Sequence, residues 1–314
     1  MRRRSPSRSE RRSRGGALAV TGSRPNPRFG GEWTEEKLGI LEAYLNAYTT
    51  ALRNQPSRES PFKLVYVDAF AGTGEIEQGL QDDPVSQADT KHLVMGSAER
   101  ALRVDDRPFD HLVFVERDPD RCRQLGSLAS KHLGRSIEII KADANDHLVK
   151  LRPNEYGANW RGVLFLDPFG TQLEWATVEH IAKLNRLDTW LLFPVGAIGR
   201  MLPVSRDPGD VSPAWDHRLT RVYGDRSWQQ LYSESPQTNL FGSPERERQK
   251  GVDGLLRIYK ERLGTVFGSR LLRESHALRN SKGSPLFEFL FCVGHPGGSK
   301  VAKRIVRHLV WSQS

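Results

Sequence analysis

Apolar residues form short, unbroken runs along the central part of the chain, and stretches with helical periodicity lie between these runs. The run Val163-Leu164-Phe165-Leu166 is an example, because it offers no polar residue to either face of a strand. Strands of this kind are buried on both faces, which is typical of a parallel sheet covered by helices. The predicted strands are 64–67, 112–116, 136–141, 162–167 and 188–193. The predicted helices between them are 97–105, 118–132, 144–151 and 174–185.

An amphipathic helix is predicted before the first strand, over about 34–52. Thr34 suits the N-cap position, and two acidic residues follow it in the first turn. Apolar residues then recur every three or four positions, which gives the helix one apolar stripe. The stripe consists of Leu38, Leu41, Leu45, Tyr48 and Leu52.

The pattern loosens after Pro194. Residues 200–245 are rich in Pro, Asp, Arg and Gly and contain Trp215 and Trp228, which favours an insertion with short helices. A helix over about 246–267 follows. The last elements are two strands joined by the turn Asn280-Ser281-Lys282-Gly283 and a final helix, predicted over 270–279, 286–293 and 298–311.

Five parallel strands followed by an antiparallel hairpin make a sheet of seven strands. This layout is typical of the class I methyltransferase fold, which uses S-adenosylmethionine (SAM). The predicted fold is therefore α/β, with a doubly wound, mostly parallel seven-stranded sheet, a C-terminal antiparallel hairpin and a helical insertion. We expect a disordered arginine-rich tail over 1–30 and one methyltransferase-like domain over 31–314, with insertions at about 75–96 and 200–245.

The net charge of +9 comes almost entirely from the N-terminal tail. Residues 1–28 hold nine arginines and one acid, Glu10, so that the rest of the chain carries about +1. Such a segment has too few apolar residues to offset its ordering entropy. It is interpreted either as a loose arm that binds phosphates or as a solvated extension. A further alternative is that these residues precede the true start codon.

Several classes of protein are excluded by composition. No apolar stretch approaches the roughly 20 residues that cross a bilayer, and the N-terminus lacks the apolar core of a secretory signal. Cys122 and Cys292 are the only cysteines, so a disulfide scaffold is excluded and a cytoplasmic location is expected. The nine histidines show no metal-ligand spacing, so no metal site is predicted.

Candidate ligand-binding residues are those at the carboxyl ends of the strands, where open α/β sheets bind their ligands. The first strand leads into Asp68-Ala69-Phe70-Ala71-Gly72-Thr73-Gly74. The two glycines permit a tight turn and a close approach of a ligand to the backbone. Glu77 stands where a dinucleotide fingerprint has its third glycine. The predicted cofactor loop thus comprises Asp68, Ala69, Phe70, Gly72 and Gly74, with Asp68 at the amino-acid end of SAM; the alternative is an ordinary strand-to-helix turn.

The second and third strands also end at acidic residues. Glu116 can accept hydrogen bonds from both ribose hydroxyls, while Asp118 is the better candidate for capping the next helix. Asp143, followed by Ala144, is predicted to accept the adenine amino group, and it could equally cap the following helix. The ordered occurrence of three acids at successive strand ends favours a cofactor site.

The fourth strand ends at Asp167-Pro168-Phe169-Gly170. Methyltransferases that act on exocyclic amines carry Asp or Asn, then Pro, then an aromatic residue at this position. A carboxylate that accepts the amine hydrogens raises electron density on the nitrogen, proline holds the loop rigid, and the aromatic ring stacks on a base swung out of its strand. Asp167, Pro168 and Phe169 are therefore the predicted catalytic residues, and a buried turn with Phe169 in the core is the alternative.

The spacing between the first two acids is unusually long. Asp68 and Glu116 are 48 positions apart, where about 20 is usual. The excess lies in 75–96, and a long loop inside a compact domain is typically a lid or a disordered excursion. We predict a lid over the cofactor.

These residues together resemble the three-Cys-motif partner (TcmP) family over about 33–312. The resemblance rests on Asp68 to Gly74, Gly96-Ser97-Ala98, Phe165 to Gly170 with Trp175, Asp188-Thr189-Trp190 through Phe193-Pro194, Arg200-Met201-Leu202, Trp228 and Ser284 to Phe287. The family is bacterial and is named for its genomic neighbour, a protein with a three-cysteine, radical-SAM-like motif. The resemblance implies a class I methyltransferase-like fold and such a protein as a partner.

The sequence therefore predicts a SAM-dependent methyltransferase that acts on an exocyclic amine of a nucleic-acid base. The basic face of the last helix, formed by Lys300, Lys303, Arg304 and Arg307, and the arginine tail are candidate phosphate contacts to RNA or DNA. That face is equally well explained as a solvated surface. Two alternatives remain, namely a SAM-binding accessory protein without catalysis and a nucleic-acid-binding module on a degenerate methyltransferase fold.

Overall fold

The computed structural model describes residues 32–71, 96–202, 209, 211–238, 244–248 and 251–311. Several predictions lie outside these residues. They concern the arginine-rich tail, Gly72 and Gly74 of the predicted cofactor loop, and all but the last residue of the lid predicted over 75–96.

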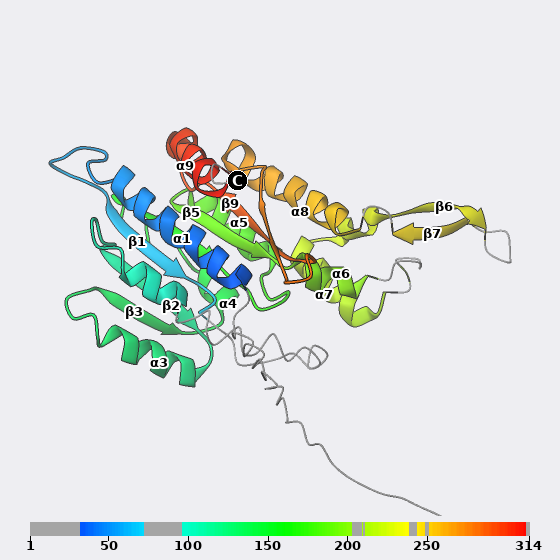
Figure 1. Ribbon diagram of the computed structural model, residues 1–314, viewed down its shortest axis with the longest axis horizontal. Coiled ribbons are helices and arrows are strands. Elements are labelled where there is room, and N and C mark those ends of the chain that lie inside the picture. Colours follow the sequence, from blue (N-terminus) through cyan, green and yellow to red (C-terminus); the bar gives the residue numbers. More distant parts are fainter. Residues whose placement is uncertain are drawn as a thin grey trace, which may run out of the picture.

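A seven-stranded sheet forms the centre of the molecule, with the strand order β3-β2-β1-β4-β5-β9-β8 (Figure 1). Strands β1 to β5 run parallel to one another, whereas β9 runs antiparallel to both β5 and β8. The strands are β1 (Lys63–Asp68), β2 (His111–Glu116), β3 (Ile137–Lys141), β4 (Trp160–Leu166), β5 (Leu187–Phe193), β8 (His276–Arg279) and β9 (Pro285–Cys292). The chain thus has the predicted α/β fold of the class I methyltransferase type.

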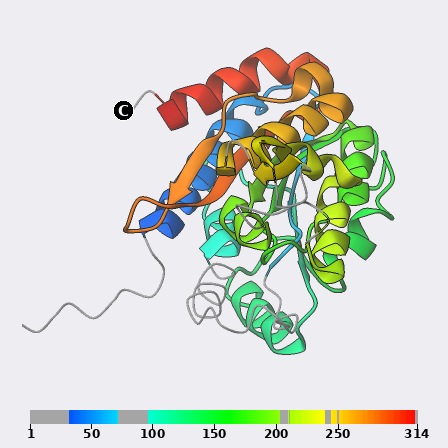
Figure 2. The same cartoon turned by 90° about the vertical axis from the view of Figure 1, so that its right-hand side faces the viewer.

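Helices cover both faces of the sheet, which explains why the central strands are apolar throughout (Figure 2). Val65 and Val67 of β1 pack into one core, and Leu64 and Tyr66 pack into the other. The first core lies under α4 (Ala144–Leu148), α5 (Trp175–Leu184), α6 (Val195–Met201), α7 (Pro213–Tyr223) and α8 (Gly251–Phe267). The second lies under α1 (Glu32–Ala51), the helix at 96–102, α3 (Pro119–Ala129) and α9 (Ser299–Trp311).

The region after Pro194 departs from the prediction. Residues 200–245 contain short helices as predicted, including α7 and the 3-10 helix Arg226–Leu231, but they also contain a strand. The strands β6 (Tyr232–Thr238) and β7 (Pro244–Arg248) form an antiparallel hairpin that projects from the body of the molecule (Figure 1). The helix predicted from 246 therefore begins only at Gly251, whose φ of +48° separates strand from helix.

The C-terminal hairpin is confirmed, although its first strand is shorter than predicted. Residues 268–270 form a 3-10 helix, and the strand β8 begins at His276 rather than at 270. The guanidinium of Arg270 is buried and donates hydrogen bonds to the carbonyl oxygens of Gly294 and Ala182, which fixes this segment outside the strand. In the turn, Asn280 Oδ1 accepts from the amides of Lys282 and Ser284 at 3.0 and 2.9 Å.

Candidate functional site

The carboxyl ends of β1, β2 and β4 lie side by side, so the acids predicted at these ends share one edge of the sheet. Asp68 pairs in register with Phe114 of β2 and Phe165 of β4. Glu116 and Asp167 each lie two residues beyond those positions. The loop after β1 stays attached to both neighbours, because the amide of Ala69 donates to Phe165 O at 3.1 Å and that of Ala71 to Val115 O at 3.0 Å.

Asp68 is buried at the end of β1, with 1% of the residue exposed. Burial raises the pKa of its carboxyl from the ordinary 3.8 to about 7, against the lowering effect of a hydrogen bond from the Ser97 side chain. The negative charge of Asp167 raises this pKa further, and the positive charge of Lys37 lowers it. One oxygen, Oδ1, is buried and has no hydrogen-bond partner among the described residues. A buried carboxylate oxygen without a donor is rare and calls for an explanation.

Glu116 is in the same situation at the end of β2, with 2% of the residue exposed. Its Oε1 accepts a hydrogen bond from the amide of Asp118 at 2.7 Å. Burial nevertheless raises the pKa of its carboxyl from 4.5 to about 7. Oε2, like Oδ1 of Asp68, is buried without a hydrogen-bond partner in the part of the chain that the structure describes. Two neighbouring strands thus each present a buried carboxylate with one unsatisfied oxygen.

The acids that follow β2 and β3 cap helices. Asp118 accepts from the amides of Asp120 and Arg121 at the start of α3, as predicted. Asp143 accepts from the amides of Asn145 and Asp146 at 2.9 and 3.3 Å, so the capping alternative is realised at Asp143 Oδ1.

The end of β3 lies beside the end of β2, because the amide of Ala142 donates to Glu116 O at 3.1 Å. Ala144 is buried at the start of α4. Asp143 is half-buried at this edge, in the position predicted for the adenine contact, but its Oδ1 is already engaged in the cap.

The loop after β4 carries the predicted catalytic residues. Pro168 is buried, whereas Asp167 and Phe169 are half-buried, so Phe169 does not lie in the core as the alternative required. Gly170 has a φ of +58°, a conformation that favours glycine and turns the chain behind Phe169. Asn145 fixes the far side of this loop, because its Nδ2 donates to Gln172 O at 2.9 Å.

A lysine that sequence reasoning missed lies against the predicted catalytic acid. Lys37 of α1 has a side chain with 0% exposure, and its Nζ is 2.6 Å from Asp167 Oδ2. The ammonium also lies 5.3 Å from the centre of the Trp33 ring and 5.8 Å from that of Phe165. Asp167 Oδ1 has no hydrogen-bond donor in the part of the chain that the structure describes. The side chain of Asp167 keeps 14% exposure.

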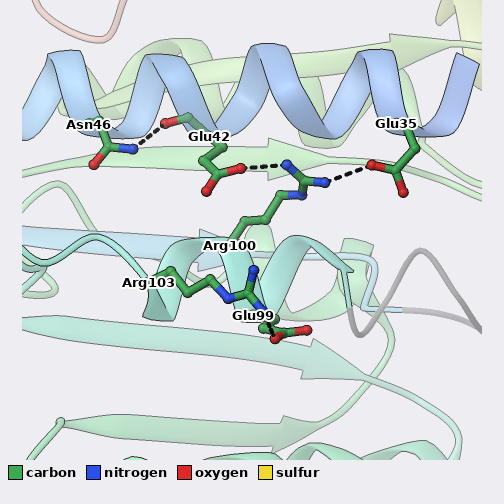
Figure 3. Close-up of polar contacts among 6 residues, drawn as sticks. All are labelled: Glu35, Glu42, Asn46, Glu99, Arg100 and Arg103. Atoms are coloured by element: carbon green, nitrogen blue, oxygen red, sulfur yellow. Dashed lines mark hydrogen bonds and ion pairs between the residues drawn. The ribbon is translucent and has the colours of Figure 1, made fainter.

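The helix that carries Lys37 is fixed to its neighbour by a charged clamp (Figure 3). Arg100, on the helix at 96–102, lies between two acids of α1 and pairs with Glu35 at 2.8 Å and with Glu42. Gly96 permits this close approach, because a Cβ at that position would be 2.7 Å from Leu38 Cδ1. The same short helix also brings Ser97 to Asp68. One contact between two helices therefore positions both Lys37 and Ser97.

A signal for Lys37 was present in the sequence. Position 37 precedes Leu41 by four residues and Leu38 by one, so it lies inside the apolar stripe of the helix. A lysine within an apolar stripe is unusual, because lysine is almost never fully buried unless it is paired. The partner could not be named from the sequence, since Asp167 is 130 positions away.

The remaining predicted cofactor residues follow Asp68 directly. Ala69 and Phe70 are buried, with 1% and 7% of each residue exposed, and both pack into the first core. Among the described residues, no helix is long and apolar enough to cross a membrane. In the same residues, no group of three or more His, Cys, Asp or Glu side chains could hold a metal ion.

Comparison with known proteins gives likeness only at the level of three-dimensional structure. Models of protein families give no match to the sequence, and neither do curated proteins. Among solved structures, the protein LPL1258 from Legionella pneumophila, of family DUF519, is 13% identical with a TM-score of 0.43, over 89% of this chain and 93% of that chain.

Two further solved structures are more distant. A protein from Thermobifida fusca proposed to be a methyltransferase is 12% identical with a TM-score of 0.39, over 84% of this chain and 80% of that chain. The plantazolicin methyltransferase BpumL, in complex with SAH, is 9% identical with a TM-score of 0.26, over 83% and 87% of the two chains. These values assign neither an activity nor a substrate to this chain. The resemblance to the TcmP family stays a prediction.

Proposed function

We propose that the protein is a SAM-dependent methyltransferase that transfers a methyl group to an exocyclic amine of a nucleic-acid base. The observation that carries the proposal is the pair of buried, unsatisfied carboxylate oxygens, Asp68 Oδ1 and Glu116 Oε2, at adjacent strand ends. Leaving such groups without donors is unfavourable, and a ligand that brings donors to both relieves this cost.

The donors that SAM offers fit these two positions. Its positively charged amino group suits Asp68, whose buried carboxylate needs a cation or a proton, and its ribose hydroxyls suit Oε2 of Glu116. Asp143 lies next along the edge with one oxygen engaged in its helix cap, which leaves Oδ2 as the adenine contact. Gly72 and Gly74 are included in the proposed cofactor loop on the basis of the sequence alone, because they lie outside the described residues.

The residues that follow the fourth strand, β4, bind and orient the substrate. SAM supplies an electrophilic methyl group on a sulfonium. Asp167 Oδ1 accepts a hydrogen bond from the target amine, while Lys37 holds Oδ2 and so fixes the orientation of the carboxylate. The carbonyl of Pro168 is the second acceptor, and the half-buried ring of Phe169 stacks on the base.

The basic face of α9 contributes less to substrate binding than its composition suggests. Lys303 Nζ donates to the carbonyl oxygens of Ser269 and Leu271 at 2.6 and 2.7 Å, and Arg307 pairs with Glu274 at 2.8 Å. Two of its four cations are thus engaged within the protein. The proposal of a nucleic-acid substrate therefore rests on the Asp167-Pro168-Phe169 loop rather than on α9. It applies equally to RNA and to DNA.

Thermal unfolding with and without S-adenosylhomocysteine (SAH) tests the cofactor. A ligand that binds only the folded protein raises the midpoint temperature of unfolding. At a ligand concentration of 100 times the dissociation constant, the folded state is stabilised by about 2.7 kcal/mol. We expect Asp68→Asn and Glu116→Gln to lose this shift. Asp106→Asn, at an exposed ion pair away from the strand ends, is the matched control and should keep the shift. Absence of a shift for the wild-type protein at saturating SAH contradicts the proposal.

Labelled methyl transfer to total bacterial RNA and DNA tests the reaction. Activity that is lost in Asp167→Ala supports catalysis at this loop. SAH binding without transfer to either nucleic acid favours instead the accessory role, in which the protein docks onto a radical-SAM-like three-Cys-motif protein. Nucleic-acid binding without any SAH shift favours the degenerate module.

A further inference from the structure

A cavity of about 400 Å³ lies at the opposite edge of the sheet from Asp68 and Asp167. Its walls come from the beginnings of β4 and β5, the second half of α1 and the first half of α9. A volume of this size is within the usual range for small-molecule sites. The residues of the proposed methyltransferase site do not line it.

Two arginines at this cavity have no acidic partner among the described residues. Arg161 Nη1 donates to Trp160 O at 2.8 Å, and Arg186 donates to Ala158 O and Asn154 Oδ1 at 2.7 and 3.4 Å. These are all of their polar contacts in the described part of the chain. Burial lowers the pKa of Arg161, and the positive charge of Arg186 lowers it further, so the two guanidinium groups repel each other. Two close, uncompensated guanidinium groups form an anion-binding arrangement.

The other titratable groups at the cavity form no ion pair with these two arginines in the described part of the chain. His295 has a pKa lowered by burial and by the nearby arginines, so it adds no positive charge at neutral pH. Asp188 is buried and keeps its carboxylate turned to other partners: Oδ2 accepts from Tyr44 Oη at 2.5 Å and Oδ1 from the amide of Gly294 at 2.6 Å, and its charge does not shift the pKa of Arg161. The guanidinium groups of Arg161 and Arg186 therefore remain the groups available to an anion.

The remainder of the cavity is apolar and aromatic. Phe62 lies under the Arg161 guanidinium, with 4.3 Å between the guanidinium carbon and the ring centre. Tyr48 of α1, Leu52 just after that helix, and Val301 and Ile305 of α9 all line the cavity. The N-terminus of α9 begins beside it at Ser299, and a helix N-terminus favours negative charge.

We propose that this cavity is a second ligand site, which binds a small molecule that carries a phosphate or carboxylate group on an aromatic body. The guanidinium groups of Arg161 and Arg186 hold the anionic group. The aromatic body lies between Tyr48, Phe62 and the apolar start of α9. This site is separate from the proposed SAM site, because Arg161 and Asp167 stand about 20 Å apart along one strand at 3.3 Å per residue.

Ligand-observed NMR titration of the full chain tests the proposal with phenyl phosphate, benzoate, inorganic phosphate and phenol as probes. We expect phenyl phosphate or benzoate to bind with a dissociation constant on the order of 0.1–1 mM. Inorganic phosphate and phenol should each bind at least about tenfold more weakly, because phosphate lacks the aromatic ring and phenol lacks the anionic group. The tighter of the two aromatic anions identifies the anionic group.

Arg161→Met and Arg186→Met should each weaken the binding of the better aromatic anion by about 10-fold to 100-fold, as expected for a lost charged hydrogen bond. Arg257→Met, on an exposed part of α8, is the matched control and should bind like the wild-type protein. Val301 is exposed at the mouth of the cavity, so Val301→Glu should fold and weaken binding by repulsion. Val301→Gln has the same size without the charge and should not weaken it.

Three results would overturn the proposal. The first is no binding of either aromatic anion by the wild-type protein at 10 mM. The second is equal binding by wild type, the two arginine variants and Val301→Glu. The third is loss of binding in Asp68→Asn, which would place the anion at the other edge of the sheet. None of these outcomes depends on whether the chain methylates a substrate.

Discussion

The pairing of Lys37 with Asp167 gives the sharpest prediction for a single side chain. The variant Lys37→Met keeps the length of the side chain and removes its ammonium. Since the Lys37 side chain has 0% exposure and that of Asp167 14%, the variant leaves a largely buried carboxylate without its cation. Removing one partner of a buried ion pair costs about 3–5 kcal/mol. The residual exposure of Asp167 places the expected loss near the lower end, at about 3 kcal/mol.

A double-mutant cycle separates this charge effect from a loss of packing. In Lys37→Met/Asp167→Asn the uncompensated charge is gone as well, so we expect the double variant to recover about 2 kcal/mol of the loss. The expected loss in Lys37→Met also becomes smaller as the pH falls from 8 to 5.5. Lys37 lowers the pKa of Asp68, so that its removal favours the protonated, neutral form of Asp68.

Urea unfolding followed by far-UV circular dichroism measures these free energies. Arg53→Met is the matched control, because the pair of Arg53 and Asp106 is exposed, with side-chain exposures of 43% and 67%. Such surface pairs contribute about 0–1 kcal/mol. A loss below 1 kcal/mol for Lys37→Met, or strictly additive effects in the cycle, would refute the assignment of Lys37 and Asp167 as a coupled buried pair.

Two further predictions concern stability. Because Asp68 has a pKa of about 7 when folded and 3.8 as its ordinary value, the folded state holds a proton that the unfolded state has lost between these pH values. The free energy of unfolding of the wild type should therefore fall relative to that of Asp68→Asn as the pH rises from 5 to 7, by up to about 1.4 kcal/mol per pH unit. Urea unfolding at several pH values measures both free energies, and the same pH dependence in the two proteins would contradict this. Gly162→Ala should cost about 1–3 kcal/mol, because its Cβ would lie 2.4 Å from Val65 O and 2.8 Å from Leu187 Cδ2. Gly126→Ala, with no atom within 4 Å, should instead gain a few tenths to 1 kcal/mol; similar values for the two glycines would be inconsistent with the packing described.

Features governed by local rules could be predicted from the sequence. Runs such as that ending at Leu166 identify buried strands, and parallel strands put their carboxyl ends at one edge, so Asp68, Glu116 and Asp167 were expected to meet before any distance was known. The helix cap at Asp118 is predictable as well, because capping depends only on residues two or three positions away.

Features that depend on distant contacts could not be predicted. Lys37 gave a local anomaly in its helix, but its partner is set by how α1 packs on the sheet. The hairpin of β6 and β7 was missed because its residues are polar and show no clear alternation, so their pairing is not visible in the pattern. The approach of Arg161 to Arg186 depends on the adjacency of β4 and β5, and no short-range pattern reports it.

Three buried acids differ in whether the protein itself supplies hydrogen-bond donors to both of their oxygens. Burial raises the pKa of Asp188 to about 6, yet both of its oxygens accept hydrogen bonds, so that the protein alone accounts for this group. Asp68 and Glu116 are as deeply buried and have pKa values raised to about 7, but each keeps one oxygen without a donor from the described residues. Unsatisfied buried groups that reduce stability tend to persist where a function needs them. Because these two oxygens lie on adjacent strands at the edge that also carries Asp167, we propose that one ligand with a cationic and a hydroxyl end supplies the missing donors to both.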